Sequence, residues 1–417
     1  MKYRVIVWGK RTGWQLLLAL LAFIQVVGTF TLLTERLYLV KWLGGLAVAL
    51  CFFLLGRGRI SGALAPEFAM LVAVLAIGLL AQLGDSIDGR AVALVFSYTI
   101  TGTTAFLVAP AALRRRSVQR IVWSGLLLGT TVATALGVYL GFQNLFTAFS
   151  LTTGRLRFSG AFYSANAAGV AGLIGVILAV AAFEARRWWR YLVPIPFFFA
   201  VMLLSDSRGS LLAAMVFLAV FPILRIARWP PQRMAIALSL GAAGLVLIGT
   251  MLGSRIDWPA PGQLGPELNR VSSGRWTNWK ESLSYLDGPL RWMFGLGMSR
   301  NFSFAFQETD FPVPVRGSNA DNFFVDILGR TGIVGLLLIL GIIGSLTLKM
   351  WRGLIRGTAR DASRYALGLA LLASTVVLGG TNSIIFTWAW LQAMVAWPLI
   401  GAAATHPVEA PDRTHSA

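Results

Sequence analysis

Long apolar runs alternate with short polar segments along most of the chain. A run of about 20 mostly apolar residues can cross a bilayer as a helix, and a helix satisfies its own backbone hydrogen bonds, which lipid cannot do. We therefore predict an all-α integral membrane protein with about twelve transmembrane helices, in which residues 1–403 form a single polytopic membrane domain. The expected spans lie near residues 15–33, 39–56, 67–84, 91–110, 121–141, 162–184, 192–205, 210–227, 234–252, 323–350, 365–380 and 383–403.

One long polar segment, residues 253–322, interrupts this pattern. It is rich in proline and is expected to form a long loop outside the membrane that carries short helices. Within it, Arg275 to Leu286 has the spacing of an amphipathic helix lying at the membrane surface, with Trp276 and Trp279 among its residues. The last residues, 404–417, are expected to be a disordered tail.

The composition supports a membrane protein, because hydrophobic residues make up 56% of the chain and charged ones only 13%. A net charge of +19 would suggest nucleic-acid binding in a soluble protein. Here the basic residues fall in short clusters between apolar runs, which is the pattern that orients membrane helices. Their distribution predicts an inner-membrane protein with cytoplasmic termini and a long loop on the outer side, and no nucleic-acid partner.

The known cofactor motifs are absent from the sequence. It has no GxxxxGK[ST] phosphate loop, no dinucleotide-binding glycine fingerprint and no metal-binding His/Cys pattern. The single cysteine, Cys51, cannot form a disulfide within the chain, and both histidines, His406 and His415, lie in the polar tail. We therefore expect neither a nucleotide nor a metal cofactor.

Several arginines fall on the expected outer side, against the orientation bias. They are Arg155, Arg157, Arg208 and Arg275. A guanidinium group is a flat, permanently charged fork that suits phosphate oxygens. Several such groups near the outer interface would suit a lipid-linked diphosphate. The alternative is that each arginine pairs with a nearby carboxylate, such as Asp206, or with lipid headgroups.

Two polar residues, Asp321 and Asn322, precede the apolar run that begins at residue 323. Asp and Asn often cap the free N–H groups at a helix start, so a capping role is one interpretation. The other is that Asp321 is a carboxylate that accepts a proton from a sugar hydroxyl.

The order of these segments resembles the O-antigen ligase and O-antigen polymerase superfamily over residues 155–340. The matching residues are Arg157, Gly160, Phe162 and Asn166, then Ser205, Ser207 and Arg208, then Gly274, Arg275 and Trp279, then Gly295 and Gly297, and finally Asn322, Gly332 and Gly335. The resemblance implies a glycosyltransferase that moves a glycan from undecaprenyl diphosphate to an acceptor on the periplasmic face. Ligases use lipid A–core as the acceptor, whereas polymerases use the next lipid-linked repeat unit.

The sequence departs from the ligase pattern at one position, because Asp321 stands where the ligases carry a histidine. This favours a polymerase of O-antigen or exopolysaccharide repeat units, with a ligase as the alternative. An unperturbed aspartate has a pKa of about 3.9 and is ionised at neutral pH, so Asp321 could still act as the base.

The resemblance gives each candidate residue a role. Asp321, Arg275 and Arg208 are the expected catalytic residues. Arg155, Arg157, Asn166, Trp279 and Asn322 are the expected substrate-binding residues. The expected partners are the undecaprenyl-diphosphate-linked donor, a glycan or lipid A–core acceptor, membrane lipid and a chain-length regulator. Two other interpretations remain: a transporter or flippase of a lipid-linked or anionic molecule, and a scaffold without catalytic activity.

Overall fold

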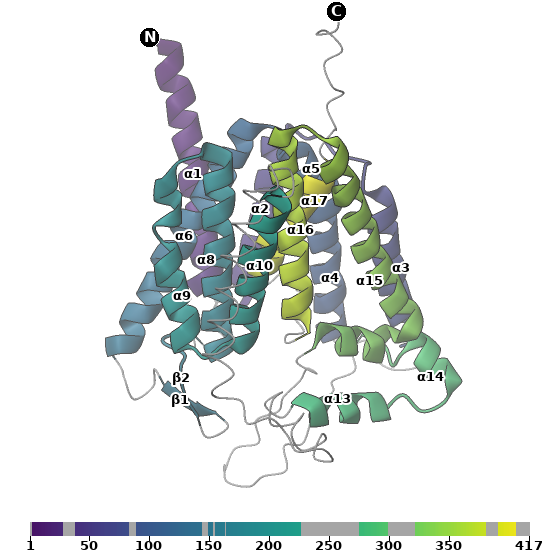
Figure 1. The fold of residues 1–417 in the computed structure, drawn as a ribbon. Coiled ribbons are helices and arrows are strands. Elements are labelled where there is room, and N and C mark those ends of the chain that lie inside the picture. Colours follow the sequence, from purple (N-terminus) through teal and green to yellow (C-terminus); the bar gives the residue numbers. More distant parts are fainter. Residues whose placement is uncertain are drawn as a thin grey trace, which may run out of the picture.

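The structure is a computed structural model that describes residues 2–27, 38–82, 89–143, 149–152, 155–162, 164–226, 275–298, 322–380 and 391–405. These residues form a helical bundle with a small hairpin and two short helices at one end (Figure 1). The first elements are α1 (Lys2–Val27), α2 (Tyr38–Leu55), α3 (Ala65–Leu80), α4 (Gly89–Gly102), the π-helix η1 (Thr103–Val108), α5 (Ala109–Ala112), α6 (Arg116–Gln143), β1 (Phe149–Thr152) and β2 (Arg155–Phe158). The others are α8 (Ala165–Arg186), the 3-10 helix η2 (Trp189–Leu192), α9 (Ile195–Leu204), α10 (Arg208–Ile226), α13 (Arg275–Ser284), α14 (Pro289–Phe294), α15 (Phe323–Arg356), α16 (Ala359–Gly379) and α17 (Leu391–Ala404).

The helices have the length and composition of membrane spans. In the described residues, six helical segments are long and apolar enough to cross a membrane, and further apolar helices are shorter. Their outward surfaces carry large hydrophobic side chains, such as Leu128, Leu337 and Leu348, which suits contact with lipid. These findings confirm the all-α membrane fold. The total of twelve spans stays a prediction, and the expected span 234–252 and tail residues 406–417 lie outside the described residues.

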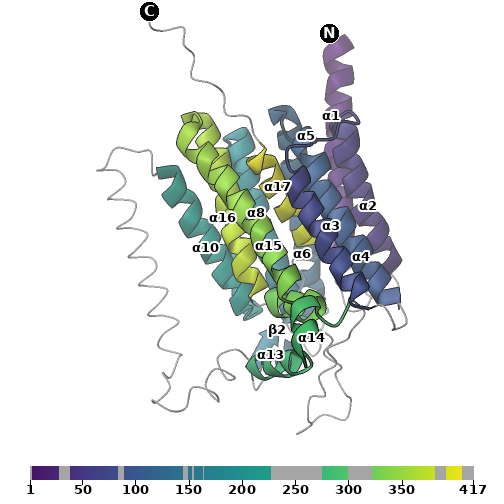
Figure 2. The ribbon, with the colours of Figure 1, turned by 90° about the vertical axis from the view of Figure 1, so that its right-hand side faces the viewer.

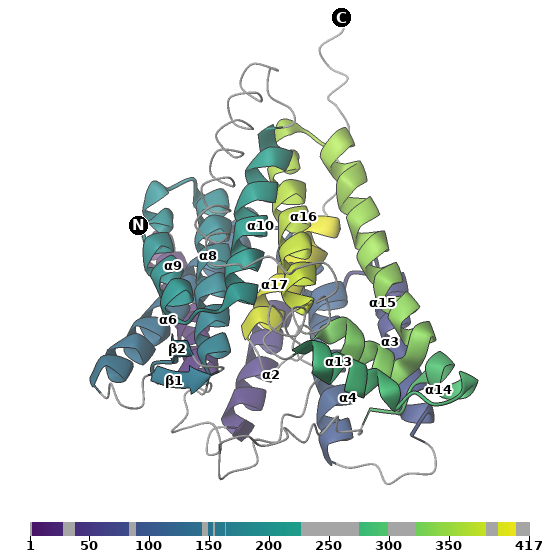
Figure 3. The same cartoon turned by 60° about the horizontal axis from the view of Figure 1, so that its bottom comes forward.

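The two ends of the bundle differ in what they carry (Figures 1 and 2). One end holds the start of α1 and the end of α17, and we call it the terminal face. The other end holds β1, β2, α13 and α14, and we call it the hairpin face. Figure 3 brings the hairpin face toward the viewer and shows β1 and β2 on one side of it and α13 and α14 on the other.

Close helix packing in the first half depends on glycine. Helix α6 lies against α1, and Gly125 and Gly129 of α6 face the backbone of α1. A Cβ atom at Gly129 would lie only 1.9 Å from the carbonyl oxygen of Ala19. Small residues commonly allow such close approach between membrane helices.

Two buried or half-buried carboxylates tie helices together near the terminal face. Glu67 of α3 is fully buried, and its Oε1 lies 2.6 Å from Nζ of Lys349 on α15. Glu184 of α8 accepts from Arg225 of α10 at 2.8 Å and from Ser363 of α16 at 2.5 Å. Each carboxylate therefore links segments that are far apart in the chain.

The packing of α1 on α6 gives a stability prediction. Gly129→Ala should lower the stability of the detergent-purified protein by about 1–3 kcal/mol, because the added methyl group overpacks the contact with Ala19. The measurement is thermal or denaturant unfolding. Gly344→Ala is the matched control, since a Cβ atom there meets nothing within 4 Å. It should be neutral or stabilising, by about 0.5–1 kcal/mol. Equal effects of the two substitutions would contradict this packing.

Candidate functional site

The arginines Arg155 and Arg157 lie in a β-hairpin that the sequence analysis did not predict. Strands β1 and β2 pair antiparallel, with Ser150 opposite Arg157 and Thr152 opposite Arg155. Polar and apolar residues alternate along both strands, which is the signal that could have revealed them. On the apolar side, Phe158 is buried and stacks on Phe142 of α6 at 5.4 Å between ring centroids.

A tight turn leads from β2 into α8. Gly160 has a φ of +59°, a conformation that favours glycine, and a Cβ atom there would lie 2.9 Å from the carbonyl oxygen of Gly137. The same oxygen accepts a hydrogen bond from the Ala161 amide at 3.0 Å. Ser164 then caps α8 by accepting from the Ala167 amide at 3.2 Å. This geometry fixes the end of β2 against α6.

The guanidinium of Arg157 joins three separate parts of the chain. Its Nε donates to the carbonyl oxygen of Ser205 at 3.1 Å, and its Nη2 donates to that of Asp206 at 3.1 Å. Nη2 also donates to Oδ1 of Asn166, in the first turn of α8, at 2.9 Å. Arg157 thus holds β2, the start of α8 and the turn between α9 and α10 in one arrangement.

The turn between α9 and α10 consists of Ser205, Asp206 and Ser207. Asp206 has a φ of +44°, which Asp and Asn tolerate better than most residues. Both serines are buried, and a Cβ atom at Gly169 of α8 would lie 2.2 Å from Cβ of Ser207. Because α8 passes so close, only small residues fit on both sides of this contact.

Arg208 follows this turn directly as the first residue of α10. Its side chain is 47% exposed, and its Nε lies 3.8 Å from Oδ1 of Asp206. That distance and exposure describe a weak surface pair. The arginine therefore combines an exposed charge with the positive end of a helix dipole, an arrangement that favours anions.

Asn322 caps α15 on the hairpin face. Its Oδ1 accepts from the amides of Phe324 at 2.9 Å and Val325 at 3.2 Å. Its Nδ2 donates to the carbonyl oxygen of Gly380, at the end of α16, at 3.1 Å. The capping role considered for this pair of residues thus belongs to Asn322, while Asp321 lies just before it and outside the described residues.

Helix α15 is broken at Gly332, which has a φ of +66° and a ψ of −169°. Residues 323–331 run across the hairpin face, and the rest of the helix turns into the bundle (Figures 1 and 3). Carbonyl oxygens near the break accept from outside the helix: Leu296 N to Gly329 O is 2.9 Å, and Gly297 N to Arg330 O is 3.0 Å. Backbone amides of the Gly295–Gly297 segment therefore pair with the carbonyl oxygens that precede the break.

Glycine is required at this junction for close backbone contact. A Cβ atom at Gly295 would lie 2.3 Å from the carbonyl carbon of Arg330, and one at Gly332 would lie 2.3 Å from that of Met293. Both glycines also have positive φ angles. Close backbone contact and a positive φ angle therefore explain why positions 295 and 332 are both glycine.

A buried ion pair completes the same junction, and the sequence analysis missed it. Nε of Arg330 lies 3.0 Å from Oδ2 of Asp326, one turn earlier on α15, and the arginine side chain is only 2% exposed. Nη1 of Arg330 donates to the carbonyl oxygen of Met298. The spacing of four residues was visible in the sequence, but nothing in the sequence indicated that the pair would be buried.

Helix α13 lies against the first part of α15. Leu286 and Leu296 are buried together, with Leu283, Tyr285 and Leu328 packed around them. On α13 the rings of Trp276 and Trp279 meet edge to face, with their centroids 6.1 Å apart. Arg275 is the first residue of this helix. Helix α13 therefore places the segment from Arg275 to Trp279 next to the part of α15 that precedes the break at Gly332.

The candidate residues thus form two groups on the hairpin face. Arg157, Asn166 and Arg208 gather around the α9–α10 turn. Asn322 and Trp279 belong to the α13–α15 junction, where the backbone also places Arg275. In the described part of the chain, no cluster of three or more His, Cys, Asp and Glu side chains could hold a metal ion.

The fold and this face define a multi-pass α-helical membrane protein with cationic residues and helix starts gathered at one end. Residues 193–340, roughly a third of the chain, match the family model described as O-antigen ligase. The match supports the resemblance to the O-antigen ligase and polymerase superfamily over this region of the chain. A search of curated proteins found no match.

The matched region contains Arg208, Arg275, Asp321 and Asn322, but it begins after the β-hairpin. Arg157 and Asn166 lie before it, yet their hydrogen bonds to each other and to Ser205 and Asp206 attach them to it. The family match over residues 193–340 supports a function of the O-antigen ligase or polymerase type in general terms.

The buried pair gives a test of the α15 junction. Arg330→Ala should destabilise the purified protein by about 3 kcal/mol or more, because it leaves Asp326 buried without its partner. Unfolding in detergent measures this change. Asp287 and Arg291 form a matched pair with the same residue types and the same spacing of four residues, but both are exposed. Arg291→Ala should therefore leave stability unchanged. If Arg291→Ala and Arg330→Ala lowered stability equally, the burial of the Asp326–Arg330 pair would not explain the loss.

Proposed function

We propose that the protein is a periplasmic-face glycosyltransferase that polymerises lipid-linked repeat units of O-antigen or exopolysaccharide. The donor is a glycan on undecaprenyl diphosphate, and the acceptor is a hydroxyl group of the next lipid-linked unit. The observation that carries this proposal is the family match over residues 193–340. The matched residues include Arg208, Arg275 and the Asp-Asn pair at 321 and 322, all of which the sequence analysis selected.

The electrostatics of the hairpin face support a diphosphate ligand. Helices α8, α10 and α15 all begin at this face (Figure 1). Each helix start carries roughly half a positive charge from its aligned peptide dipoles. Arg208 adds a full, exposed charge at the start of α10. Negative charge that develops on the leaving diphosphate would be stabilised by such fixed positive groups.

The proposed chemical step is a direct transfer. The acceptor hydroxyl oxygen attacks the anomeric carbon of the donor, and the bond between that carbon and the diphosphate oxygen breaks. The bonding electrons leave with undecaprenyl diphosphate, where Arg208 and Arg275 bind the charge. Asp321 accepts the hydroxyl proton. Because the donor already carries a good leaving group, the step needs neither a nucleotide nor a metal.

The contacts of Arg157 and Asn166 suggest positioning roles. Arg157 directs three hydrogen bonds to protein acceptors around the α9–α10 turn. In our proposal these two residues hold the α9–α10 turn in place, and the turn in turn fixes the position of Arg208. Asn322 does the same for Asp321, because it fixes the adjacent end of α15 to α16. Arg155 and Trp279 remain proposed substrate contacts.

Two other functions give different products. A ligase would move finished polymer to lipid A–core, with Asp321 acting in place of the family histidine. A transporter or flippase would move a lipid-linked molecule without changing the length of its glycan. The aspartate at position 321 is the observation that favours polymerisation.

Gene deletion followed by complementation distinguishes these functions. In the deletion strain, we expect the surface-glycan ladder on a gel to collapse to single repeat units. Wild type should restore the ladder, whereas Arg208→Ala, Arg275→Ala and Asp321→Ala should each reduce long chains at least tenfold, since each removes a proposed transition-state contact. Mass spectrometry of lipid-linked glycans measures chain length.

The controls are matched in charge and location. Arg291→Ala and Asp287→Ala each remove an exposed charge near α14 on the same face, and both should complement like wild type. Full-length polymer stranded on the lipid carrier would indicate a ligase instead. Unchanged glycans in the deletion strain would contradict both transferases and favour the transporter.

A further inference from the structure

The segment between α13 and the glycines of the α15 junction leaves the protein interior and returns to it. Leu286 before it and Leu296 after it are buried together, whereas every residue from 287 to 294 is exposed. This segment contains α14, and none of the residues of α14 is buried. The helix projects at the edge of the hairpin face (Figures 1 and 3). It is therefore a protruding element that is held at both ends.

The side chains exposed on α14 are mostly large and apolar. Leu290 is 75% exposed, and Trp292, Met293 and Phe294 are exposed as well. Contact between water and four such side chains so close together in the chain is unfavourable. An exposed apolar patch of this kind commonly marks a surface that a partner or a membrane covers.

Helix α13 differs from α14 in this respect. The sequence analysis expected the amphipathic segment from Arg275 to Leu286 at the membrane surface. In the structure, its residues Leu283 and Leu286 pack with Leu296. The apolar side of α13 is thus used at least in part within the protein, whereas the apolar side chains of α14 are left exposed.

Helix α14 lies at the end of a surface that faces lipid. A Cβ atom at Gly332 would lie 2.3 Å from the carbonyl carbon of Met293 in α14, and the next residue, Ile333, is exposed. Leu337 and Leu340 are also exposed and follow on the same face of α15, at helical spacing. This stripe of apolar side chains runs from the break into the membrane-spanning part of α15. The exposed side chains of α14 therefore adjoin it.

The length of α15 sets the level of α14 in the bilayer. Trp351 is exposed and lies next to Arg352, a pair of residue types typical of a membrane interface. From Trp351 to the break at Gly332 the helix rises by about 28 Å, and the hydrocarbon core of a bilayer is about 30 Å thick. The break therefore lies near the opposite boundary of that core. Because α14 packs against the break, it lies at the same boundary.

We propose that α14 inserts into the lipid leaflet on the hairpin side and anchors the α15 junction there. Its four apolar side chains contact acyl chains just below the headgroups, at the level where tryptophan is common. The exposed ion pair of Asp287 and Arg291 marks its polar side. Lipid is favoured over a protein partner because α14 adjoins a surface of α15 that already faces lipid. This insertion does not depend on the proposed glycan chemistry.

The test uses the full-length protein in lipid nanodiscs. The buried Cys51 is replaced by alanine, and one nitroxide-labelled cysteine is introduced at a time. Electron paramagnetic resonance measures collisions with oxygen, which concentrates in hydrocarbon, and with a water-soluble nickel chelate. For Leu290→Cys, the ratio of oxygen to nickel collisions should approach that of the lipid-facing Leu337→Cys. It should be several-fold higher than for the matched control Asp287→Cys, which lies at the polar side of the same segment.

Two results would overturn the proposal. Equal ratios at positions 287 and 290 would place α14 in water. A label at position 290 that is shielded from both reagents, or that shows spin–spin broadening between two molecules, would mean that a protein partner or a second copy covers α14 in place of lipid.

A second measurement uses the wild-type protein and avoids any effect of the substitutions on folding. A phospholipid with a photoactivatable group on its acyl chain, close to the glycerol, is incorporated into the nanodiscs. Mass spectrometry should then find crosslinks within residues 289–294. Crosslinks within residues 333–340 without any in 289–294 would show that lipid covers α15 but not α14, which would contradict the insertion.

Discussion

The fold depends on the requirement that backbone polar groups near lipid find partners within the protein. Regular helices meet this requirement by themselves. Among the described residues, the interruption of α15 at Gly332 is one place where the helix alone does not meet it. There the Gly295–Gly297 segment supplies amides to the carbonyl oxygens of Gly329 and Arg330. Because Gly295 and Gly332 lack side chains, the two backbones can approach closely enough to form these bonds. The buried pair of Asp326 and Arg330 then holds the junction in place. Loop and helix therefore form one structural unit on the hairpin face.

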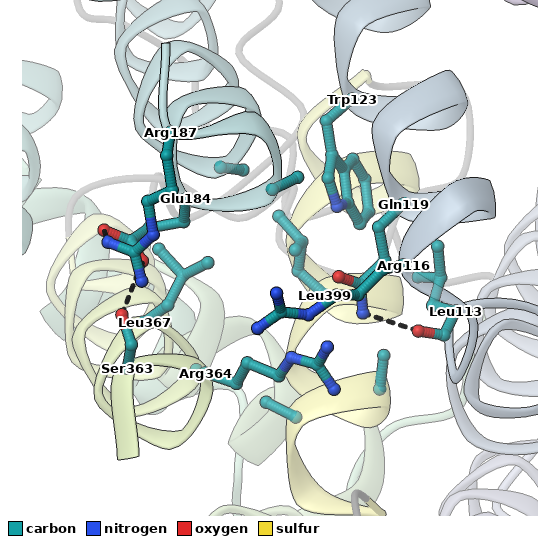
Figure 4. A pocket seen from close by; sticks show the side chains of 15 residues that line it. Leu113, Arg116, Gln119, Trp123, Glu184, Arg187, Ser363, Arg364, Leu367 and Leu399 are labelled. Carbon is teal, nitrogen blue, oxygen red and sulfur yellow. Dashed lines mark hydrogen bonds and ion pairs between the residues drawn. The ribbon is translucent and has the colours of Figure 1, made fainter. Parts of the chain in front are cut away.

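The same principle organises the other half of this face. Arg157 satisfies the carbonyl oxygens of the α9–α10 turn and binds the start of α8 through Asn166. The exposed Arg208 is thus carried by a turn that several elements hold rigidly. In the proposed transferase, preorganised positive charge at this position stabilises the leaving diphosphate, because it needs no rearrangement during the reaction. At the terminal face, two other arginines, Arg116 and Arg364, extend into a pocket from opposite sides (Figure 4).

Apolar run length was enough to predict the helices, since α6, α8 and α16 lie where long apolar stretches occur. The order of short motifs along the chain was also enough to name Arg208 and the glycine motifs as candidates. Features that depend on distant contacts were not predictable. The burial of Arg330 depends on Met298, which is 32 residues away in the chain. The engagement of Arg157 by Ser205 depends on packing across 48 residues. The β-hairpin was missed although its alternating pattern was present, because the pattern covers only two four-residue strands.

The central claim is that the hairpin face transfers glycan from a polyprenyl diphosphate. The most direct test incubates the purified protein with a lipid-linked repeat unit, without added nucleotide, and measures both glycan length and released undecaprenyl diphosphate. The account predicts longer chains, with one diphosphate carrier released for each new linkage, and loss of both signals in Arg208→Ala while Arg291→Ala remains active. Chains that do not lengthen with the folded wild-type protein, or that lengthen equally well with Arg208→Ala, would contradict it.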